Sequence, residues 1–197
     1  MILSIDTGLN NFGISVIGLD GAIHYMDVIR TKKETKKGTS VASDYTRRLA
    51  YITTELKKVI VEYPLTIITA EMPSFGAQSF DAIVSLTAGA TIVISLSSFH
   101  NLPLVYTSPG DVKESFTGDR NASKKKIMAK CCKMYGWDIT YKSIKDKRVP
   151  GGIRKDPIYH VMGKKLGAGY FEHIADSIAV FHTCKKLKQF KEITNGN

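Results

Sequence analysis

The chain has 197 residues, of which 43% are hydrophobic, a composition that excludes a disordered chain and leaves room for one domain with a sizeable core. Its 28 Lys and Arg against 18 Asp and Glu give a net charge of +10, which predicts attraction to polyanions, chiefly nucleic acid or an anionic membrane surface. The three cysteines are Cys131, Cys132 and Cys184. Their odd number excludes a disulfide framework, and no CxxC spacing indicates a metal site, so we expect reduced thiols in a cytoplasm. The opening segment has no basic region before its apolar run, so we expect no signal peptide.

The first thirty residues predict an antiparallel meander of three strands, because three apolar runs rich in β-branched residues are separated by turn residues. These runs span residues 2–5, 12–19 and 22–30. Asp20-Gly21 between the second and third is a strong hairpin signal.

The rest of the chain alternates helical and extended patterns. In chain order we expect a polar loop over 31–43, a helix from an N-cap at Asp44 to Pro64, a strand over 65–70, a helix over 77–99, a strand over 103–107, helices over 109–118 and 122–135, an irregular basic loop over 138–169, and a last helix over 170–187 before a polar tail. This order predicts an α/β fold with a mixed sheet and helices on its faces. We expect a single domain over 1–197, with a basic loop insertion at about 138–168.

Residues 82–99 carry no charge and reach the minimum length for a membrane span. However, the run contains six Ser and Thr, and Asp81 and His100 bound it closely. We interpret it as a buried central helix and expect no membrane partner.

Two predicted apolar strands are followed by an acidic residue, and the first turns of the last predicted helix contain further acidic residues. Asp6 follows the first strand and Glu71 the fourth, while His173 and Asp176 lie three residues apart and share a helix face. Taken singly, such acids are commonly caps, solvated groups or a first turn that favours the helix dipole. Together they offer oxygen ligands and one imidazole, a set that suits Mg²⁺ or Mn²⁺. In a basic protein this cluster would repel DNA unless metal ions neutralised it, which favours metal-dependent phosphodiester chemistry.

Several segments resemble, in order and spacing, the motifs of the RuvC family of Holliday-junction resolvases, a branch of the RNase H-like superfamily. They are ILSIDTG (2–8), NNFGISVIG (10–18), IRTK (29–32), TAE (69–71), VK (112–113), the segment from Gly118 to Lys124, and HIADSIA (173–179). The resemblance covers about residues 1–137 and 169–183. Thr7 stands where the family has proline, His173 stands where many members have Asp, and residues 138–168 have no counterpart that we can place. An imidazole in place of a carboxylate would soften divalent binding and make activity more sensitive to pH.

The resemblance implies an RNase H-like fold with a mixed five-stranded sheet, and an endonuclease that resolves four-way junctions by paired, metal-dependent cuts leaving 5′-phosphates. It implies two Mg²⁺ ions, replaceable by Mn²⁺, bound by Asp6, Glu71, His173 and Asp176. It also implies that Lys124 stabilises the transition state and that Lys113 positions the backbone, although either could be an ordinary surface lysine. Paired cuts on a two-fold symmetric substrate call for a homodimer, for which the helix over 77–99 is a candidate interface unless it is core. The expected setting is a bacterial or phage-infected cytoplasm.

Further DNA contacts are expected from one aromatic residue and several basic ones. They are Phe75, Lys36, Lys37, Arg47, Arg48, Lys125 and Lys126. The resemblance implies that Phe75 stacks on a base at the crossover of the junction. The alternative interpretation is that Phe75 is a buried hydrophobic anchor. Three rival functions stay open: another RNase H-like nuclease acting on branched DNA, flaps or RNA–DNA hybrids; a non-catalytic DNA-binding protein; and an actin-like kinase, whose second phosphate loop is not found.

Overall fold

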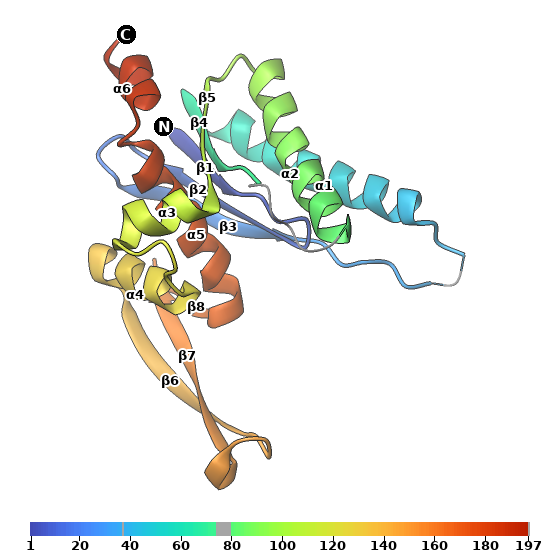
Figure 1. The fold of residues 1–197 in the computed structure, drawn as a ribbon, viewed down its shortest axis with the longest axis vertical. Coiled ribbons are helices and arrows are strands. Elements are labelled where there is room, and N and C mark those ends of the chain that lie inside the picture. Colours follow the sequence, from blue (N-terminus) through green and yellow to red (C-terminus); the bar gives the residue numbers. More distant parts are fainter. Residues whose placement is uncertain (37, 74–79, 197) are drawn as a thin grey trace.

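A mixed five-stranded sheet forms the centre of the computed structural model, which describes residues 1–36, 38–73 and 80–196 (Figure 1). Its strands are β1 (Ile2–Asp6), β2 (Asn11–Ile17), β3 (Ile23–Arg30), β4 (Ile67–Glu71) and β5 (Leu104–Thr107), in the order β3-β2-β1-β4-β5. The first three pair antiparallel, and β4 and β5 run parallel to β1. The predicted meander and mixed sheet are thus confirmed.

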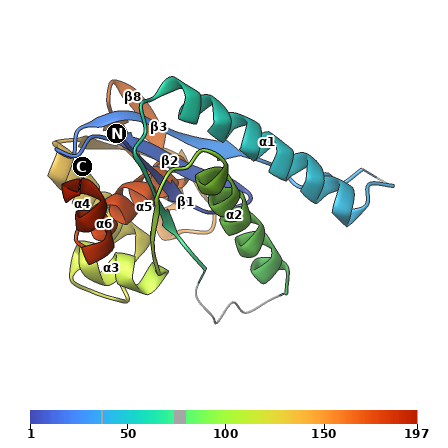
Figure 2. The same cartoon turned by 90° about the horizontal axis from the view of Figure 1, so that it is seen from above.

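Helices cover both faces of this sheet (Figures 1 and 2). One layer holds α1 (Val41–Glu62) and α2 (Phe80–Phe99), and the other holds α3 (Pro109–Thr117), α4 (Lys124–Tyr135), α5 (Ala168–Cys184) and α6 (Lys188–Asn195). Alternation along the strands builds a hydrophobic core on each side, since Leu3 packs in the cluster with α1 and α2 while Ile2 packs in the cluster with α3 to α6. The segment after α5, expected as a polar tail, forms α6, which buries Phe190.

The N-cap of α1 is Ser40, whose side chain accepts from the Ser43 amide, so the predicted cap at Asp44 is wrong. Asp44 lies one turn inside the helix and is 4% exposed. It forms an ion pair with Arg48, also 4% exposed, on the face that continues through Ile52.

Residues 138–167 form a second, three-stranded antiparallel sheet, so the expected irregular loop is wrong. The strands are β6 (Asp138–Lys145), β7 (Ile153–Val161) and β8 (Lys164–Gly167). Pro150, Gly151 and Gly152 make only the turn, where both glycines adopt positive φ. Pro157 pairs with Tyr141 of β6 but has no partner in β8, whose pairing begins at Ile158, so it occupies the kind of edge position where a strand tolerates proline. The β6–β7 hairpin projects from the body of the molecule (Figure 1).

α2 lies on the surface, so its prediction as a buried central helix is wrong. Val93 is fully buried against the sheet, but Ile83, Ile94 and Phe99 are 49%, 53% and 79% exposed. A helix that is apolar all round does not reveal which side the chain itself covers, which explains the error. Within the described ranges, none of the helices has the length and apolarity needed to cross a membrane.

Candidate active site

The ends of two parallel strands place Asp6 and Glu71 at one edge of the sheet. Each is the last residue of its strand, and the register that pairs Ile5 with Ala70 brings the two ends side by side. The Thr7 hydroxyl donates to the Glu71 carbonyl at 2.9 Å and ties the two strand ends together. This edge is where ligands bind in open α/β sheets, outside the carboxyl ends of the strands.

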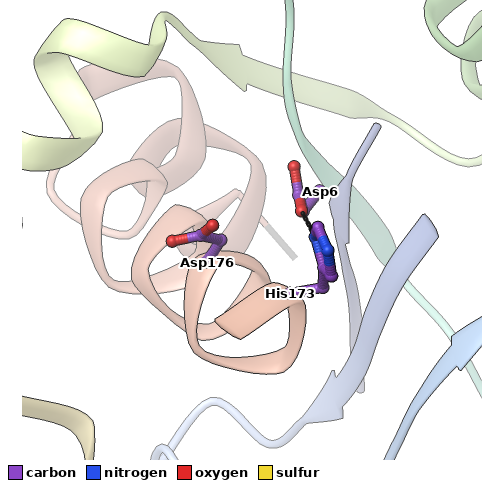
Figure 3. Close-up of side chains that lie close together, drawn as sticks. All are labelled: Asp6, His173 and Asp176. Atoms are coloured by element: carbon purple, nitrogen blue, oxygen red, sulfur yellow. Dashed lines mark hydrogen bonds and ion pairs between the residues drawn. The ribbon is translucent and has the colours of Figure 1, made fainter. Parts of the chain in front are cut away.

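Helix α5 brings His173 and Asp176 to the same place (Figure 3). His173 Nδ1 lies 3.0 Å from Asp6 Oδ2, and one possible ligand atom from each of Asp6, His173 and Asp176 lies within 4.8 Å of the others. Figure 3 shows the imidazole and the Asp6 carboxylate pointing at each other, with Asp176 one turn further along the helix. Residues 167 positions apart in sequence thus form one potential cation site.

A cavity of about 290 Å³ joins these groups to two lysines. It is lined by all six residues predicted as catalytic, which are Asp6, Glu71, Lys113, Lys124, His173 and Asp176. We call it the acid–lysine pocket. Each lysine comes from a separate short helix, Lys113 from α3 and Lys124 from the first turn of α4.

Glycine at position 13 lets α5 approach the sheet. Gly13 pairs with Asp6 across β1 and β2, and a Cβ there would lie 2.2 Å from the His173 carbonyl oxygen. Any side chain would therefore push the helix, and its two site residues, away from Asp6. No local pattern in the sequence predicts this close approach.

Buried hydroxyls fix the same helix from below. Ser4 Oγ donates to the Ser177 carbonyl, Ser177 Oγ lies 2.6 Å from Ser15 Oγ, and Thr69 Oγ1 donates to Ser4 Oγ. All four residues are fully buried. Three strands and α5 share this network, so the height of His173 and Asp176 above the sheet is set by hydrogen bonds that tolerate little displacement.

Electrostatics in the pocket favour a cation. Burial, together with the charges of Asp6 and Asp176, raises the pKa of Glu71 to about 8. Burial and the charge of Asp6 raise the pKa of Asp176 to about 7. These carboxyl groups hold protons near neutral pH because like charges are gathered where water is scarce. A divalent ion would relieve that repulsion, so the donor set fits a metal of the Mg²⁺ type.

Glu172, the residue before His173 in α5, contacts one of the pocket lysines, and no role was predicted for it from the sequence. Its carboxylate forms an ion pair with Lys124. Burial lowers the pKa of Lys124, but the Glu172 hydrogen bond and the charges of Asp176, Glu172 and Asp6 outweigh it and raise the pKa overall. Lys124 is therefore held as a cation beside the acids.

The other predicted DNA contacts lie outside the pocket. Arg48 is buried, and its guanidinium is used by Asp44, Thr31 and Asn10, so the prediction that it contacts phosphate is wrong. Arg47 is half exposed and bonds to Asp44 and the Lys32 carbonyl.

Lysines among these predictions remain at the surface where the structure describes them. Lys36 and Lys125 are exposed, and Lys126 pairs with Asp119 at 3.0 Å. Phe75 and Lys37 lie outside the described residues.

Sequence comparison finds relatives that share a name. The chain is 33% identical over 96 residues to the crossover junction endodeoxyribonuclease RuvC of Chloroherpeton thalassium, and 26% identical over 137 residues to that of Cytophaga hutchinsonii. These matches cover 48% and 68% of this chain, but only 50% and 64% of the two relatives. The RuvC of Rickettsia prowazekii is 28% identical over 130 residues, 65% of this chain and 78% of the relative. No protein-family model matches the chain.

Solved structures show the same fold. Thermus thermophilus RuvC gives a TM-score of 0.61 at 16% identity over 98% of this chain and 96% of that one. The same protein in complex with a Holliday junction substrate gives 0.60 at 17%, covering 92% and 90%. The yeast mitochondrial Holliday junction resolvase Ydc2 gives 0.53 at 15%, covering 93% and 77%. The resemblance to the RuvC family and the RNase H-like fold expected from the sequence are confirmed.

Proposed function

We propose that this chain is a metal-dependent endonuclease that resolves four-way DNA junctions by paired cuts, leaving 5′-phosphates. The observation that carries the proposal is the acid–lysine pocket, where all six predicted catalytic residues line one cavity. The relatives named crossover junction endodeoxyribonuclease and the shared fold of RuvC bound to a Holliday junction support it.

The proposed cofactor is Mg²⁺, two ions per site, with Mn²⁺ as a substitute. Asp6, His173 and Asp176 would hold the first ion, and Glu71, which lines the same pocket, would complete the set for a second. Divalent ions, when bound, supply an activated water and neutralise charge on the scissile phosphate. The chain's own part is to hold the donors in place, which the Asp6–His173 contact and the hydroxyl network beneath α5 support.

The two lysines have separate proposed roles. Lys124, held by Glu172 beside the carboxylates, places a positive charge where negative charge develops on the phosphate. Lys113 lines the pocket from α3 and would orient the DNA backbone. Neither role needs a change in protonation, because both side chains act as cations.

We further propose a homodimer, because paired cuts need two sites related by a two-fold axis. An apolar groove of about 810 Å³ lies between α1 and α2, lined by residues that include Leu49, Ile92 and Leu96. Phe99, at the groove, is 79% exposed. An exposed apolar groove is the kind of surface that contacts between subunits use.

The proposed setting is a single domain over residues 1–197 acting in a bacterial or phage-infected cytoplasm. The second candidate function is an RNase H-like nuclease with the same pocket but another substrate, such as flaps, other branched DNA or RNA–DNA hybrids. A non-catalytic DNA-binding protein is disfavoured because the full set of acids and lysines is assembled.

The decisive experiment offers a labelled four-way junction and a matched linear duplex, each with Mg²⁺ or EDTA, to the wild-type chain and Asp6→Asn. Paired nicks on the junction alone, dependent on Mg²⁺ and absent in Asp6→Asn, are expected. Since metal ions supply several kcal/mol of charge stabilisation, Asp6→Asn should lose about a thousandfold in rate. Preference for flaps or hybrids would move the assignment to the second candidate, and binding without cutting would overturn the catalytic one.

A further inference from the structure

The three-stranded sheet of β6, β7 and β8 holds half of the net charge of the protein. Residues 138–167 contain eight Lys and Arg against three Asp, a net charge of +5 out of +10. Six of these eight basic residues lie on the β6–β7 hairpin, residues 138–161, which leaves the body of the molecule (Figure 1). With eight residues in β6 at about 3.3 Å per residue, its length is about 26 Å.

The two faces of the hairpin differ in how this charge is compensated. Side chains of directly paired residues share a face, and the pairs alternate along the ribbon. On one face, Arg154 forms a bidentate pair with Asp156 and also bonds to Asp146 in the turn. Asp146 further holds Arg148 through two bonds of 2.9 Å. Both arginines of the hairpin are therefore used within it.

The opposite face carries no acid. It presents, in paired order, Tyr141 with Pro157, Ser143 with Lys155, and Lys145 with Ile153, and we call it the basic face. Tyr141 is 65% exposed and Ile153 59% exposed. Across the described residues, neither Lys145 nor Lys155 has an ion-pair partner within 4.0 Å, whereas the arginines do.

The base of the hairpin is fixed to the helix that carries the site. Tyr159, on the same side of the ribbon as Tyr141, packs its ring 4.4 Å from that of Phe171 in α5. Strand β8 runs directly into α5, two turns ahead of Asp176. The ribbon thus extends from the end of α5 that bears His173.

We propose that the hairpin is a DNA-binding arm whose basic face contacts the phosphates of duplex DNA leaving the acid–lysine pocket. A two-stranded ribbon has the width that the major groove admits. Lysines act as point charges and contact phosphates, whereas base reading favours the bidentate fork of arginine, and both arginines here are occupied by aspartates. The contact is therefore independent of the DNA sequence. Only the cutting of the bound DNA rests on the proposed function.

The test measures binding of the wild-type chain and Lys145→Gln/Lys155→Gln to a labelled four-way junction in EDTA, over a range of salt concentrations. Each phosphate contact contributes about 0.9 to the slope of log K against log salt, so the double variant should lower the slope by about 1.8. Lys145→Arg/Lys155→Arg should restore it. The matched control is Lys133→Gln/Lys191→Gln, which removes two exposed lysines from α4 and α6 and should leave the slope unchanged.

An unchanged slope in the hairpin variant, or an equal fall in the control, would overturn the DNA-arm proposal. Cleavage by the wild-type chain with Mg²⁺ is scored separately. If the wild-type chain cuts the junction and the hairpin variant has the wild-type slope, the DNA-arm proposal is rejected and the proposed function stands. If the hairpin variant has a reduced slope and the wild-type chain does not cut, the DNA arm stands and the nuclease assignment is rejected.

Discussion

The acid–lysine pocket gathers carboxylates where water is scarce, whereas the β6–β7 hairpin spreads lysines over a ribbon that solvent surrounds. In the pocket, burial and neighbouring charges raise the pKa of Glu71 to about 8 and that of Asp176 to about 7. On the hairpin, Lys145 and Lys155 are exposed. Charge that is buried must be placed to within a fraction of an ångström, while exposed charge acts at a distance and is screened by salt.

The difference also appears in how each region is held. The residues of the pocket rest on a buried hydroxyl network and on a glycine that lets two backbones touch. The distal hairpin is held by its own strand pairing and by the bonds of Arg148 and Arg154 to Asp146 and Asp156, and its base packs on the body. We therefore expect substitutions in the pocket to act on chemistry and those on the distal hairpin to act on affinity.

Among the comparisons between matched residues, the largest expected effect concerns two lysines of α4. Lys124→Gln should lower the single-turnover cleavage rate about a hundredfold or more, as the loss of one charge-stabilising donor commonly does, with binding nearly unchanged. Lys126 lies two residues further along α4 and is paired with exposed Asp119. Lys126→Gln should therefore change the cleavage rate by less than about fivefold. Equal losses would mean that α4 contributes only general positive charge.

A second comparison uses two tyrosines on the same side of the hairpin. Tyr159 is 5% exposed against Phe171, so Tyr159→Ala should lower the free energy of unfolding by about 3 kcal/mol. Tyr141→Ala, at a 65% exposed site, should change it by less than about 0.5 kcal/mol. Urea unfolding measures both, and a large loss from Tyr141→Ala would show that the distal ribbon packs on something.

A third comparison substitutes two glycines. Gly13→Ala places a methyl group against the His173 carbonyl and should cost about 1–3 kcal/mol of stability and much of the cleavage activity. Gly169→Ala, in α5 with open space around it, should be neutral or stabilising by up to about 1 kcal/mol. Thermal unfolding and cleavage assays would contradict the close approach at position 13 if both variants behaved alike.

Sequence patterns predicted the strands, helices and site residues at positions where the local pattern agrees with the fold. The apolar runs ending in Asp6 and Glu71 locate the edge of the sheet, and helical spacing brings His173 and Asp176 to one side of α5. Arg48 shows a missed signal. It precedes Ile52 by four residues on the buried face of α1, so its helical spacing already indicated burial rather than contact with DNA.

Two other features could not be predicted from local patterns. The hairpin was not predicted because Pro150, Gly151 and Pro157 are typical of irregular backbone. In the structure Pro150 and Gly151 form the turn, and Pro157 has no partner in β8. The approach of Gly13 to His173 joins residues 160 positions apart, and no spacing along the chain encodes it. Both depend on which segments meet in space.

The smallest expected effect concerns stability and pH in the metal-free chain. Glu71 has a folded-state pKa of about 8 against an ordinary value of 4.5, so the folded chain keeps a proton that the unfolded chain releases. The sign follows from linkage: wild-type stability falls as pH rises from about 4.5 to about 8, and Glu71→Gln removes this fall. Because the Glu71 side chain is only partly buried, we expect a gain for Glu71→Gln of only about 1 kcal/mol at pH 8.5, vanishing near pH 4.5. Thermal unfolding in EDTA at both pH values measures it, and Lys58→Gln, at an exposed ion pair, is the control that should show no such dependence. A Glu71→Gln chain that loses stability at pH 8.5 would mean that the carboxylate is already compensated within the pocket, and the case for a bound cation would weaken accordingly.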